Sequence, residues 1–493
     1  MKIKNKNNNK HIMFSNYNNV RSIYFIGIGG IGMCGIAKIL LQLGYQISGS
    51  DLIMNIRMQE LILLGAKIYL GHNNFSKIKN MDVIVFSTAI KFNNPELVFA
   101  KQNNILVLHR AVILADLMQC YYSLIVSGTH GKTTTTAMII EIFLFLQKNP
   151  TFVNGGVLKK TNLYANLGTD KYFITEADES DKSFLSFNPI VNLTTNIDFE
   201  HLEYYQNNIN VLKDNFVTFF NKVPFYGCNI LCIDNVHIRH LLKEQRIHKH
   251  VITYGFHKSA TIQIYNYIQN NHKCTFNVIH KTYNNNNNIF QLTLNIPGKH
   301  NALNATASFA LARYMNFDTY NIIHALQQYS GVKRRYDIIG EYTINQNNNK
   351  QYIKIMDDYG HHPTEINNTI KTIRQHWPQY HLIMVFQPHK YSRIHNLLDD
   401  FIKILAKVDT LFILSVYSAG EKYLETANSN IIYKKIKKLK KTNIFLGKWN
   451  NYNDMIKEIY STLFKQNILL FQGAGDINNL SSLLIQNKFN RTN

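Results

Sequence analysis

Long hydrophobic runs are missing from this chain of 493 residues, which has no stretch of 18 consecutive apolar residues. A membrane-spanning helix needs about 20 such residues, so we expect no membrane insertion. The first residues, MKIKNKNNNKHIMFSNYNN, also lack the apolar segment of a signal peptide. They are rich in Asn and Lys and show no periodicity, so residues 1–19 are predicted to be a disordered tail.

Cysteine is scarce and scattered, because the chain has five cysteines and no pair with the C-x-x-C spacing. The positions are Cys34, Cys120, Cys228, Cys232 and Cys274. This pattern favours neither a disulfide framework nor a zinc site, and it is typical of reduced thiols. The sequence therefore predicts a cytoplasmic location.

Acidic residues are few: 31 Asp and Glu stand against 53 Lys and Arg, which gives a net charge of +22. Such a charge ordinarily indicates a nucleic acid or membrane partner. However, Lys, Asn, Ile and Tyr are all in excess, and their codons are AT-rich, so mutational bias explains the composition. No recognised nucleic-acid motif accompanies the charge, and we expect no nucleic-acid partner. The basic run Lys434–Lys441 is interpreted as the solvated face or end of a helix.

A phosphate-binding loop is the strongest motif that is present. The apolar run Leu124–Val126 predicts a buried strand, and the segment SGTHGKTTTT over residues 127–136 leads from it into a predicted helix. Glycines at such a turn let backbone N–H groups converge on phosphate oxygens. The lysine Lys132 can reach the β- and γ-phosphates, and the Thr133 hydroxyl can bind Mg²⁺. The residues predicted to cradle ATP are Gly128, Thr129, His130, Gly131, Lys132, Thr133 and Thr134.

This loop departs from the usual pattern, since Val126 stands where a glycine is expected five residues before Gly131. It is therefore the shorter G-x-x-G-K-T form. A Gly/Thr turn with a chance lysine is the alternative. The order of glycine, lysine and threonine between a strand and a helix argues against that alternative.

A second glycine-rich turn lies near the start of the chain. The predicted strand Ser22–Ile26 enters the G-x-G-x-x-G turn Gly27–Gly32, a helix over Met33–Leu43 follows, and a strand over Tyr45–Gly49 leads to Asp51. This is the order of a Rossmann unit, in which the acidic residue meets a ribose. The motif indicates a nucleotide diphosphate and, taken alone, would suggest NAD.

Further polar residues follow other predicted strands. Ser87 and Thr88 end one strand, and His72 and Arg110 fall near the ends of other elements. Each of these residues alone is more often structural than functional.

An acidic segment and a histidine follow two later strands. The strand Tyr172–Thr175 leads into Glu176–Asp181, which carries four acids in six residues, and Ile190–Thr195 leads toward His201. The ends of parallel strands form the edge at which open α/β sheets bind ligands. Thr133, Glu176 and His201 could therefore share one or two Mg²⁺ ions between ATP and a substrate oxygen.

The later part of the chain repeats the alternation of strand, polar loop and helix. A helix predicted from Ile296–Asn304 carries Asn301 and Asn304 on one face, where they could meet an adenine edge or, equally on local grounds, cap the helix. A domain boundary is predicted near Gly331. Beyond it, strands and helices alternate again, which indicates another doubly wound α/β domain.

Taken together, several motifs in order resemble the Mur ligase family over roughly residues 22–483. They are SGTHGKTTTT, EADESD, TNIDFEH, PGKHNALNA, RRYD, DDYGHHPTE and QPHKYSR. The resemblance implies an α/β fold of three domains: a Rossmann-like UDP-sugar domain over residues 20–118, a central P-loop ATPase-type mixed sheet over 119–331, and a Rossmann-like domain over 332–493. It also implies that the first glycine turn holds a UDP diphosphate and not NAD.

The opening GIGGIGMCGIA and the segment TFVNGG resemble the branch of the family that joins L-alanine to UDP-N-acetylmuramate. That resemblance implies ATP and Mg²⁺ as cofactors, an acyl phosphate intermediate, a role in peptidoglycan precursor synthesis, and a monomer or weak homodimer. The nearest alternative is a ligase that attaches a whole peptide to the same sugar. A nicotinamide dehydrogenase leaves the phosphate loop unexplained, and the intact motifs argue against a degraded nucleotide-binding protein.

The resemblance also implies residue roles. Lys132, Glu176 and His201 would be catalytic, with Thr133, Glu176 and His201 at the metal. Asn301, Asn304, Arg335 and Asp358 would join the phosphate loop in binding ATP. The amino-acid pocket would be formed by Tyr359, His361, Lys390 and Arg393. The UDP-sugar would be bound by Gly27, Gly29, Gly30, Gly32, Asp51, His72, Ser87, Thr88 and Arg110.

The chain departs from the family's usual residues at some positions. Most notably, Lys390 replaces the arginine of Q-P-H-R, which keeps the charge and loses the bidentate fork. Carboxylate binding there would be looser, with Arg393 as the firmer anchor.

Overall fold

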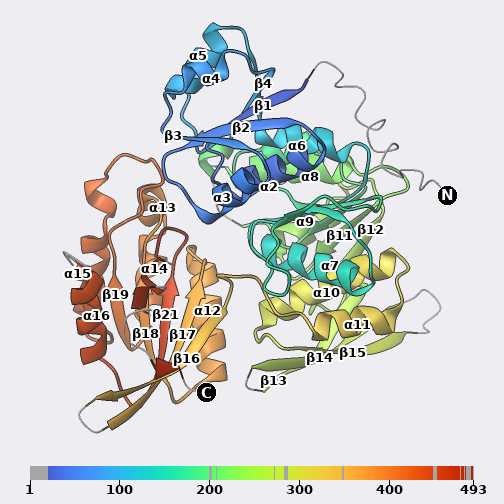
Figure 1. Cartoon of the computed structure of the whole chain (residues 1–493). Helices are drawn as coiled ribbons and strands as arrows, with labels where there is room; N and C mark the ends of the chain where they lie inside the picture. Colours follow the sequence, from blue (N-terminus) through green and yellow to red (C-terminus); the bar gives the residue numbers. More distant parts are fainter. Residues whose placement is uncertain are drawn as a thin grey trace, which may run out of the picture. The chain divides into compact units, whose positions relative to one another are not determined.

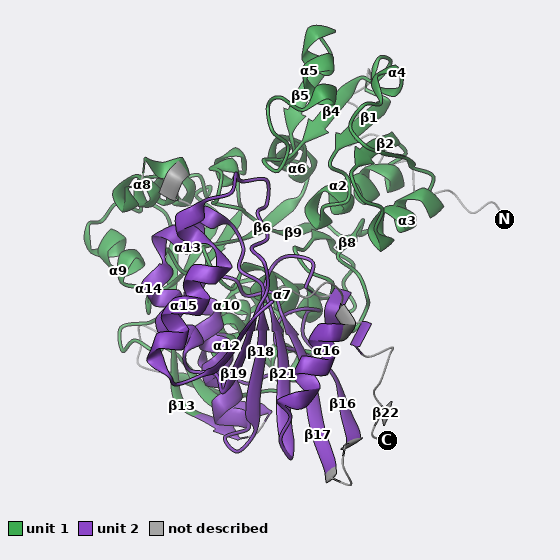
Figure 2. Ribbon diagram, turned by 90° about the vertical axis from the view of Figure 1, so that its left-hand side faces the viewer, with its two compact units in different colours: residues 1–267, 275–294, 301–329 green, residues 268–274, 295–300, 330–493 purple. Residues whose placement is uncertain are grey.

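The structure, a computed structural model, describes residues 20–198, 202–206, 208–270, 272–281, 287–346, 349–447, 452–477, 479–481, 483–484 and 490–491. The predicted tail over residues 1–19 and the predicted metal ligand His201 lie outside these ranges. The chain divides into two compact units (Figure 2). Unit 1 contains the residues up to 267, 275–294 and 301–329, and unit 2 contains 268–274, 295–300 and the residues from 330. Each unit is described by itself.

Unit 1 begins with a five-stranded parallel sheet in the order β3-β2-β1-β4-β5 (Figure 1). Its strands are β1 (Ser22–Ile26), β2 (Gln46–Asp51), β3 (Lys67–Leu70), β4 (Val83–Phe86) and β5 (Leu106–His109). Its helices are α2 (Ile31–Gln42), α3 (Ile56–Leu63), α4 (Phe75–Ile78), α5 (Pro95–Gln102) and α6 (Arg110–Met118). The predicted Rossmann order is confirmed, with helix α2 starting two residues earlier than expected.

Alternation along β1 gives this sheet two apolar faces. Ile23 and Phe25 pack in the core that α2 covers, whereas Tyr24 and Ile26 pack with Leu97 of α5 on the other face. The strand order changes direction at β1, which has β2 on one side and β4 on the other. The carboxyl ends of β1 and β4 therefore form the switch point at which such sheets bind ligands.

The second sheet of unit 1 has ten strands in the order β15-β14-β13-β12-β11-β10-β6-β9-β7-β8. They are β6 (Tyr122–Ser127), β7 (Thr151–Val153), β8 (Ala165–Asn166), β9 (Tyr172–Glu176), β10 (Val191–Thr194), β11 (Cys228–Cys232), β12 (Val251–Gly255), β13 (Ile262–Asn270), β14 (Lys273–His280) and β15 (Asn288–Leu294). Strands β7 and β8 pair antiparallel, whereas β6 lies parallel to both β9 and β10, so the sheet is mixed as expected.

The helices that accompany this sheet include α7, which follows the phosphate loop and is buried along most of its length. They are α7 (Lys132–Phe145), η2 (Ser183–Ser186), η3 (Leu202–Tyr205), α8 (Ile209–Asn221), α9 (Val236–Lys243), α10 (Lys299–Tyr314) and α11 (Thr319–Gln327). Contacts also join the two sheets of unit 1, because α2 packs against β7 and β8.

Unit 2 is built on a seven-stranded sheet in the order β20-β19-β18-β21-β17-β16-β22. Its strands are β16 (Asp337–Gln346), β17 (Asn349–Asp358), β18 (His381–Phe386), β19 (Thr410–Ile413), β20 (Asn443–Leu446), β21 (Gln466–Gln472) and β22 (Asn490–Arg491). Its helices are α12 (Pro363–His376), α13 (Tyr391–Asn396), α14 (Leu398–Leu405), η4 (Glu425–Ala427), α15 (Ser429–Leu439) and α16 (Tyr452–Ser461). The expected α/β fold with three sheets is confirmed, while the exact domain bounds stay predictions.

The helices also test two expectations from the composition, about the basic run and about membrane insertion. In α15, Lys434, Lys435, Lys437 and Lys438 are exposed, whereas Ile432 and Ile436 are buried, so the basic run is the solvated face of a helix as predicted. None of the helices within the described ranges combines the length and the apolar character that crossing a bilayer requires.

Candidate active site

The phosphate loop joins the buried strand β6 to helix α7. Gly128 and Gly131 have φ angles of +116° and +83°, in the region that favours glycine. A Cβ atom on Gly128 would lie 2.4 Å from Oγ1 of Thr195, and one on Gly131 would lie 2.9 Å from Oδ1 of Asn304. Glycine is therefore required at both positions, and the loop is a tight cradle at the N-terminus of α7.

Asn196, which follows β10, fixes the shape of this loop. Its Oδ1 accepts a hydrogen bond from the backbone N–H of His130 at 2.9 Å, and its Nδ2 donates to the carbonyl of His130 at 3.0 Å. Its own carbonyl accepts from the N–H of Thr129 at 3.1 Å. This role could not be predicted from local patterns, because Asn196 lies 66 residues from the loop.

The loop lysine is paired with a carboxylate of the acidic segment. Lys132 Nζ lies 2.6 Å from Oε2 of Glu179, and it also donates to the carbonyl of Thr129 at 3.2 Å. Burial lowers the pKa of Lys132, but the charges of Glu179 and Asp178 outweigh burial and raise it above its ordinary value. Lys132 is therefore a firmly charged ammonium at the cradle.

The two predicted metal ligands in the described chain lie together. Thr133 Oγ1 donates to Oε2 of Glu176 at 2.8 Å. A Cβ atom on Gly155 would lie 1.8 Å from Oε1 of Glu176, so the absence of a side chain there leaves room for the carboxylate. A hydroxyl and a carboxylate are the oxygen ligands that Mg²⁺ prefers, so the pair fits that ion.

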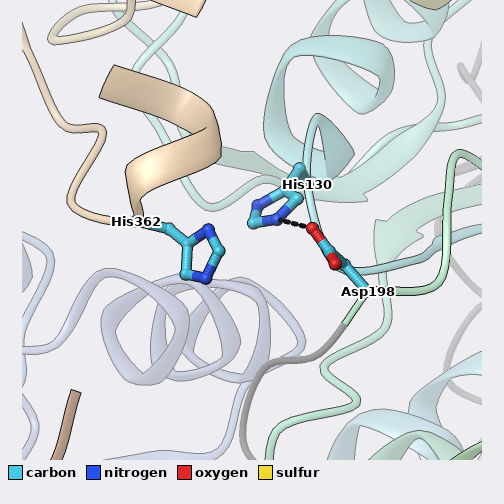
Figure 3. A group of neighbouring side chains, drawn as sticks. All are labelled: His130, Asp198 and His362. Carbon is cyan, nitrogen blue, oxygen red and sulfur yellow. Dashed lines mark hydrogen bonds and ion pairs between the residues drawn. The ribbon is translucent and has the colours of Figure 1, made fainter. Parts of the chain in front are cut away.

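His130 in the loop is bonded to Asp198, as the dashed line in Figure 3 shows, with Nε2 and Oδ2 3.1 Å apart. Both side chains are mostly buried. Figure 3 also labels His362, which belongs to unit 2 and caps α12, where its Nδ1 accepts from the N–H of Thr364. Asp198 was not predicted.

The two predicted adenine contacts lie on α10, where Asn301 and Asn304 are both buried. The side chain of Asn304 faces Gly131, as the close approach of its Oδ1 shows. The structure thus brings α10 to the phosphate loop, whereas the contact with adenine stays a prediction.

The first glycine turn is closed by Asp51. The carboxylate Oδ2 accepts a hydrogen bond from the N–H of Gly29 at 2.8 Å, and the N–H groups of Gly27 and Ile28 donate to the carbonyl of Ser50. Gly30 immediately precedes α2, so this turn also ends at a helix N-terminus. Ser87 and Thr88 follow β4 at the same edge of the sheet.

Arg110 connects this turn to the acidic segment. A Cβ atom on Gly32 would lie 3.1 Å from Nη1 of Arg110, and Nη2 of Arg110 donates to Oδ2 of Asp178 at 3.0 Å. Although burial raises it, the charges of Lys132 and Arg110 lower the pKa of Asp178 to about 2. The acidic segment therefore contacts both predicted nucleotide sites, a role that the sequence indicated only as a cluster of acids.

In unit 2, Arg335 and Asp358 lie beside Tyr359. The guanidinium of Arg335 lies 4.8 Å from the ring centre of Tyr359. Asp358 is buried, and its oxygens accept hydrogen bonds from the N–H groups of Tyr336 at 2.8 Å and Gly360 at 2.9 Å. Burial raises the pKa of Asp358. These contacts favour a role for Asp358 in shaping the backbone around Arg335.

The predicted amino-acid residues gather at the ends of β17 and β18. The ring of His361 lies 5.6 Å from that of Tyr359 and 5.2 Å from that of His389, and Nη1 of Arg393 lies 3.2 Å from Nδ1 of His389. Lys390 precedes α13 with a φ of +67°, a strained value for a residue with a side chain. His389 was missed, although the motif Q-P-H after a buried strand could have indicated it.

Comparison with known families gives matches over most of the chain. Residues 22–122 match the Mur ligase family, catalytic domain, residues 126–312 match the Mur ligase middle domain, and residues 342–475 match the Mur ligase, glutamate ligase domain.

Individual relatives agree with this result. The chain is 46% identical over 469 residues, 95% of each chain, to the UDP-N-acetylmuramate–L-alanine ligase of Buchnera aphidicola, and 42% identical over 473 residues, 95% of this chain and 98% of the other, to that of Wigglesworthia glossinidia brevipalpis. Among solved structures, the UDP-N-acetylmuramate–alanine ligase of Thermotoga maritima aligns with a TM-score of 0.78 at 26% identity, over 94% of this chain and 98% of that one. A murein peptide ligase of Psychrobacter arcticus aligns with a TM-score of 0.71 at 20% identity over 94% and 98%, which shows the fold alone.

Proposed function

Because this chain belongs to the Mur ligase family, we propose that it joins L-alanine to the carboxylate of UDP-N-acetylmuramate, with conversion of ATP to ADP and phosphate. The observation that carries the proposal is the 46% identity over 95% of both chains to a ligase of that name. The alternative, a ligase that attaches a whole peptide, has less support, because the peptide ligase of Psychrobacter arcticus is only 20% identical. The product would be a peptidoglycan precursor made in the cytoplasm.

The first step would transfer the γ-phosphoryl group of ATP to the muramyl carboxylate. Both reactants are anions, so cations must offset their repulsion. Lys132, charged and held at the cradle, is placed to neutralise the transferring group. Thr133 and Glu176, together with His201 from outside the described residues, would hold Mg²⁺, which supplies further positive charge to the phosphates when bound.

The second step would be attack of the alanine amine on the acyl phosphate, with departure of phosphate. Tyr359, His361, Lys390 and Arg393 are proposed to bind the amino acid, since cationic groups suit its carboxylate.

The UDP-sugar would lie on the first glycine turn, with Asp51, His72, Ser87, Thr88 and Arg110 around it. ATP would be bound by the phosphate loop with Asn301, Asn304, Arg335 and Asp358. We further propose a monomer or weak homodimer.

The test is phosphate release from Mg–ATP by the purified chain with UDP-N-acetylmuramate and one amine at a time. L-Alanine, glycine, L-serine and the tripeptide L-alanyl-γ-D-glutamyl-meso-diaminopimelate form the panel. We expect the highest kcat/KM with L-alanine. A preference for the tripeptide would favour the peptide ligase, and no release with any amine would contradict both proposals.

A further inference from the structure

The first sheet of unit 1 contains a buried carboxylate that the proposed mechanism does not use. Glu96 is the second residue of α5, and none of its surface is exposed. Its Oε1 accepts hydrogen bonds from the hydroxyl of Tyr24 at 3.0 Å and from the backbone N–H and Nδ2 of Asn74 at 3.1 and 2.9 Å. Its Oε2 accepts one from Oγ of Ser50 at 2.5 Å. A buried carboxylate is tolerated only where donors satisfy it in this way.

These donors keep Glu96 ionised. Burial raises its pKa, but hydrogen bonds from His72, Ser50 and Asn74 lower it below the ordinary value. The first turn of a helix also favours negative charge. An ionised carboxylate has no proton to give, so Glu96 acts only as an acceptor.

Ser50 connects this acceptor to His72. Its Oγ lies 2.5 Å from Oε2 of Glu96 and 3.0 Å from Nδ1 of His72, and Oε2 itself lies 3.4 Å from that nitrogen. The single hydroxyl proton of Ser50 must point at Glu96, so the serine presents a lone pair to His72. Nδ1 must therefore carry a proton, and an imidazole with that single proton has its lone pair on Nε2.

The place of His72 in the sheet relates it to the first glycine turn. His72 follows β3, two strands away from β1, and β1 leads into the first glycine turn. With about 4.8 Å between neighbouring strands, the separation is about 10 Å. Asp51, the acid predicted to meet the ribose, ends β2, the strand between β1 and β3, so a nucleoside that contacts it would extend toward His72. Within the described part of the chain, Nε2 of His72 has no hydrogen-bond partner, and the side chain is 14% exposed.

We propose that Glu96, acting through Ser50, holds His72 as the Nδ1–H tautomer, so that Nε2 accepts a hydrogen bond from the uridine part of the bound UDP-sugar. The identity of the ligand rests on the proposed function. Uridine offers two kinds of donor, the ribose hydroxyls and the uracil N3–H, whereas an ionised diphosphate offers none. Glu96 and Ser50 are then positioning residues, and His72 determines specificity for the nucleoside.

The tautomer can be measured directly by ¹⁵N NMR of the full chain labelled at histidine, with His72→Gln identifying the signal. We expect a protonated Nδ1 and a bare Nε2. A protonated Nε2 in the parent chain would overturn the proposal without any further variant. Glu60→Gln, which removes a carboxylate that pairs with Lys38 in the same domain, is the control and should leave the tautomer unchanged.

Glu96→Gln should reverse the direction of the chain of hydrogen bonds. The amide oxygen can still accept from Tyr24 and Asn74, but the amide NH₂ would face Ser50 and donate to it. The serine hydroxyl would then donate to Nδ1, and the imidazole proton would move to Nε2. A merely structural role for Glu96 would lower the Tm and leave the tautomer as it was. If this variant does not fold, Ser50→Ala removes the same link and should weaken the preference for Nδ1–H.

Calorimetry with UDP, 2′-deoxy-UDP and N3-methyl-UDP then identifies the donor. We expect one analogue to bind about tenfold more weakly than UDP to the parent chain, and as well as UDP to His72→Phe. Penalties that persist in His72→Phe for both analogues would overturn the proposal. Failure of UDP to bind the parent chain would overturn the proposed function, whereas bound UDP with the wrong tautomer would overturn this proposal alone.

Discussion

Lys132 Nζ lies 2.6 Å from Oε2 of Glu179, and the Glu179 side chain is only 3% exposed. The ammonium that we assign to the γ-phosphate is thus already paired with a carboxylate of the protein. Phosphate oxygens would compete with Glu179 for the same charge. The acidic segment therefore sets both the position of the lysine and the strength with which it can bind a nucleotide.

Glu179→Gln should destabilise the chain, because a largely buried ammonium loses the carboxylate with which it is directly paired. We expect a loss of about 3 kcal/mol in the free energy of unfolding, and a larger rise of Tm on adding Mg–ATP than in the parent chain, since phosphate charge replaces the carboxylate. Calorimetry with and without nucleotide measures both. The control is Glu141→Gln, which changes a different buried carboxyl, in the middle of α7. Equal Tm shifts in Glu179→Gln and the parent would contradict the competition.

Lys132→Ala should abolish most phosphoryl transfer while the fold persists. Loss of one preorganised charge at a transferring group costs about 3–4 kcal/mol of transition-state stabilisation, or 10²–10³ in kcat. ADP formation in the presence of all substrates measures the effect, and circular dichroism checks the fold. Near-normal turnover by a folded variant would overturn the role of the lysine.

Glu176→Gln should raise the Mg²⁺ concentration needed for half-maximal activity, because the site loses a charged oxygen ligand. UDP-sugar binding should change little. Asp170→Asn, just before the start of the strand that Glu176 ends, removes a carboxylate away from the loop and serves as the matched control. The same titration tests His201→Ala. Mg²⁺ curves that coincide with the parent's would show that these residues are structural.

Asp357 should make the stability of unit 2 depend on pH. Burial raises its pKa to about 6, although Arg334 lowers it. The folded chain then keeps a proton that the unfolded chain has lost, so this contribution to stability is full below about pH 4 and is lost as the pH rises through 6. The difference of about two pKa units corresponds to about 2–3 kcal/mol. From pH 4 to pH 7, the free energy of unfolding of Asp357→Asn should rise by that amount relative to that of the parent chain. A difference between the two free energies that is the same at both pH values would contradict the raised pKa.

Lys390→Arg should lower the KM for L-alanine and change kcat little. A guanidinium can bind a carboxylate through two parallel hydrogen bonds, whereas an ammonium binds it as a point charge. Initial rates at varied L-alanine and saturating ATP and UDP-sugar give both constants. Lys422→Arg, at an exposed position in the same unit, controls for the change of residue type. An unchanged KM would remove Lys390 from the pocket.

The backbone that carries the site could be predicted from local patterns. Strand, glycine turn and helix follow one another within about 20 residues at both Gly27–Gly32 and Gly128–Gly131, so their periodicity and turn chemistry are visible in the sequence. The structure also places Thr133 and Glu176 together, as the sequence led us to expect, because Glu176 ends β9 and Thr133 stands shortly after the end of β6. Their neighbouring strands, β6 and β9, pair directly.

The partners of these residues could not be predicted in the same way. Glu179 and Asn196 lie 47 and 66 residues from the loop residues that they bind. From the sequence alone, many other acids and amides in the chain were equally possible partners. Asp358 was indicated by the sequence, but its hydrogen-bond partners were not. Its motif indicated a contact with ATP, which stays a prediction. The hydrogen bonds that its oxygens accept from backbone N–H groups and from Nε2 of Gln472 are visible only in the tertiary structure.

The contact between α2 and the second sheet has a consequence for biosynthesis. A Cβ atom on Gly35 would lie 3.0 Å from the side chain of Val153 and 3.2 Å from that of Ala165. This face of α2 is therefore covered by residues that follow the first sheet in the sequence. On the ribosome, α6 is complete at residue 118, but β8 ends only at residue 166. At 5–20 residues per second, the first sheet waits about 2–10 s with this face of α2 open to water. During that interval, chaperones and proteases have access to this face of α2.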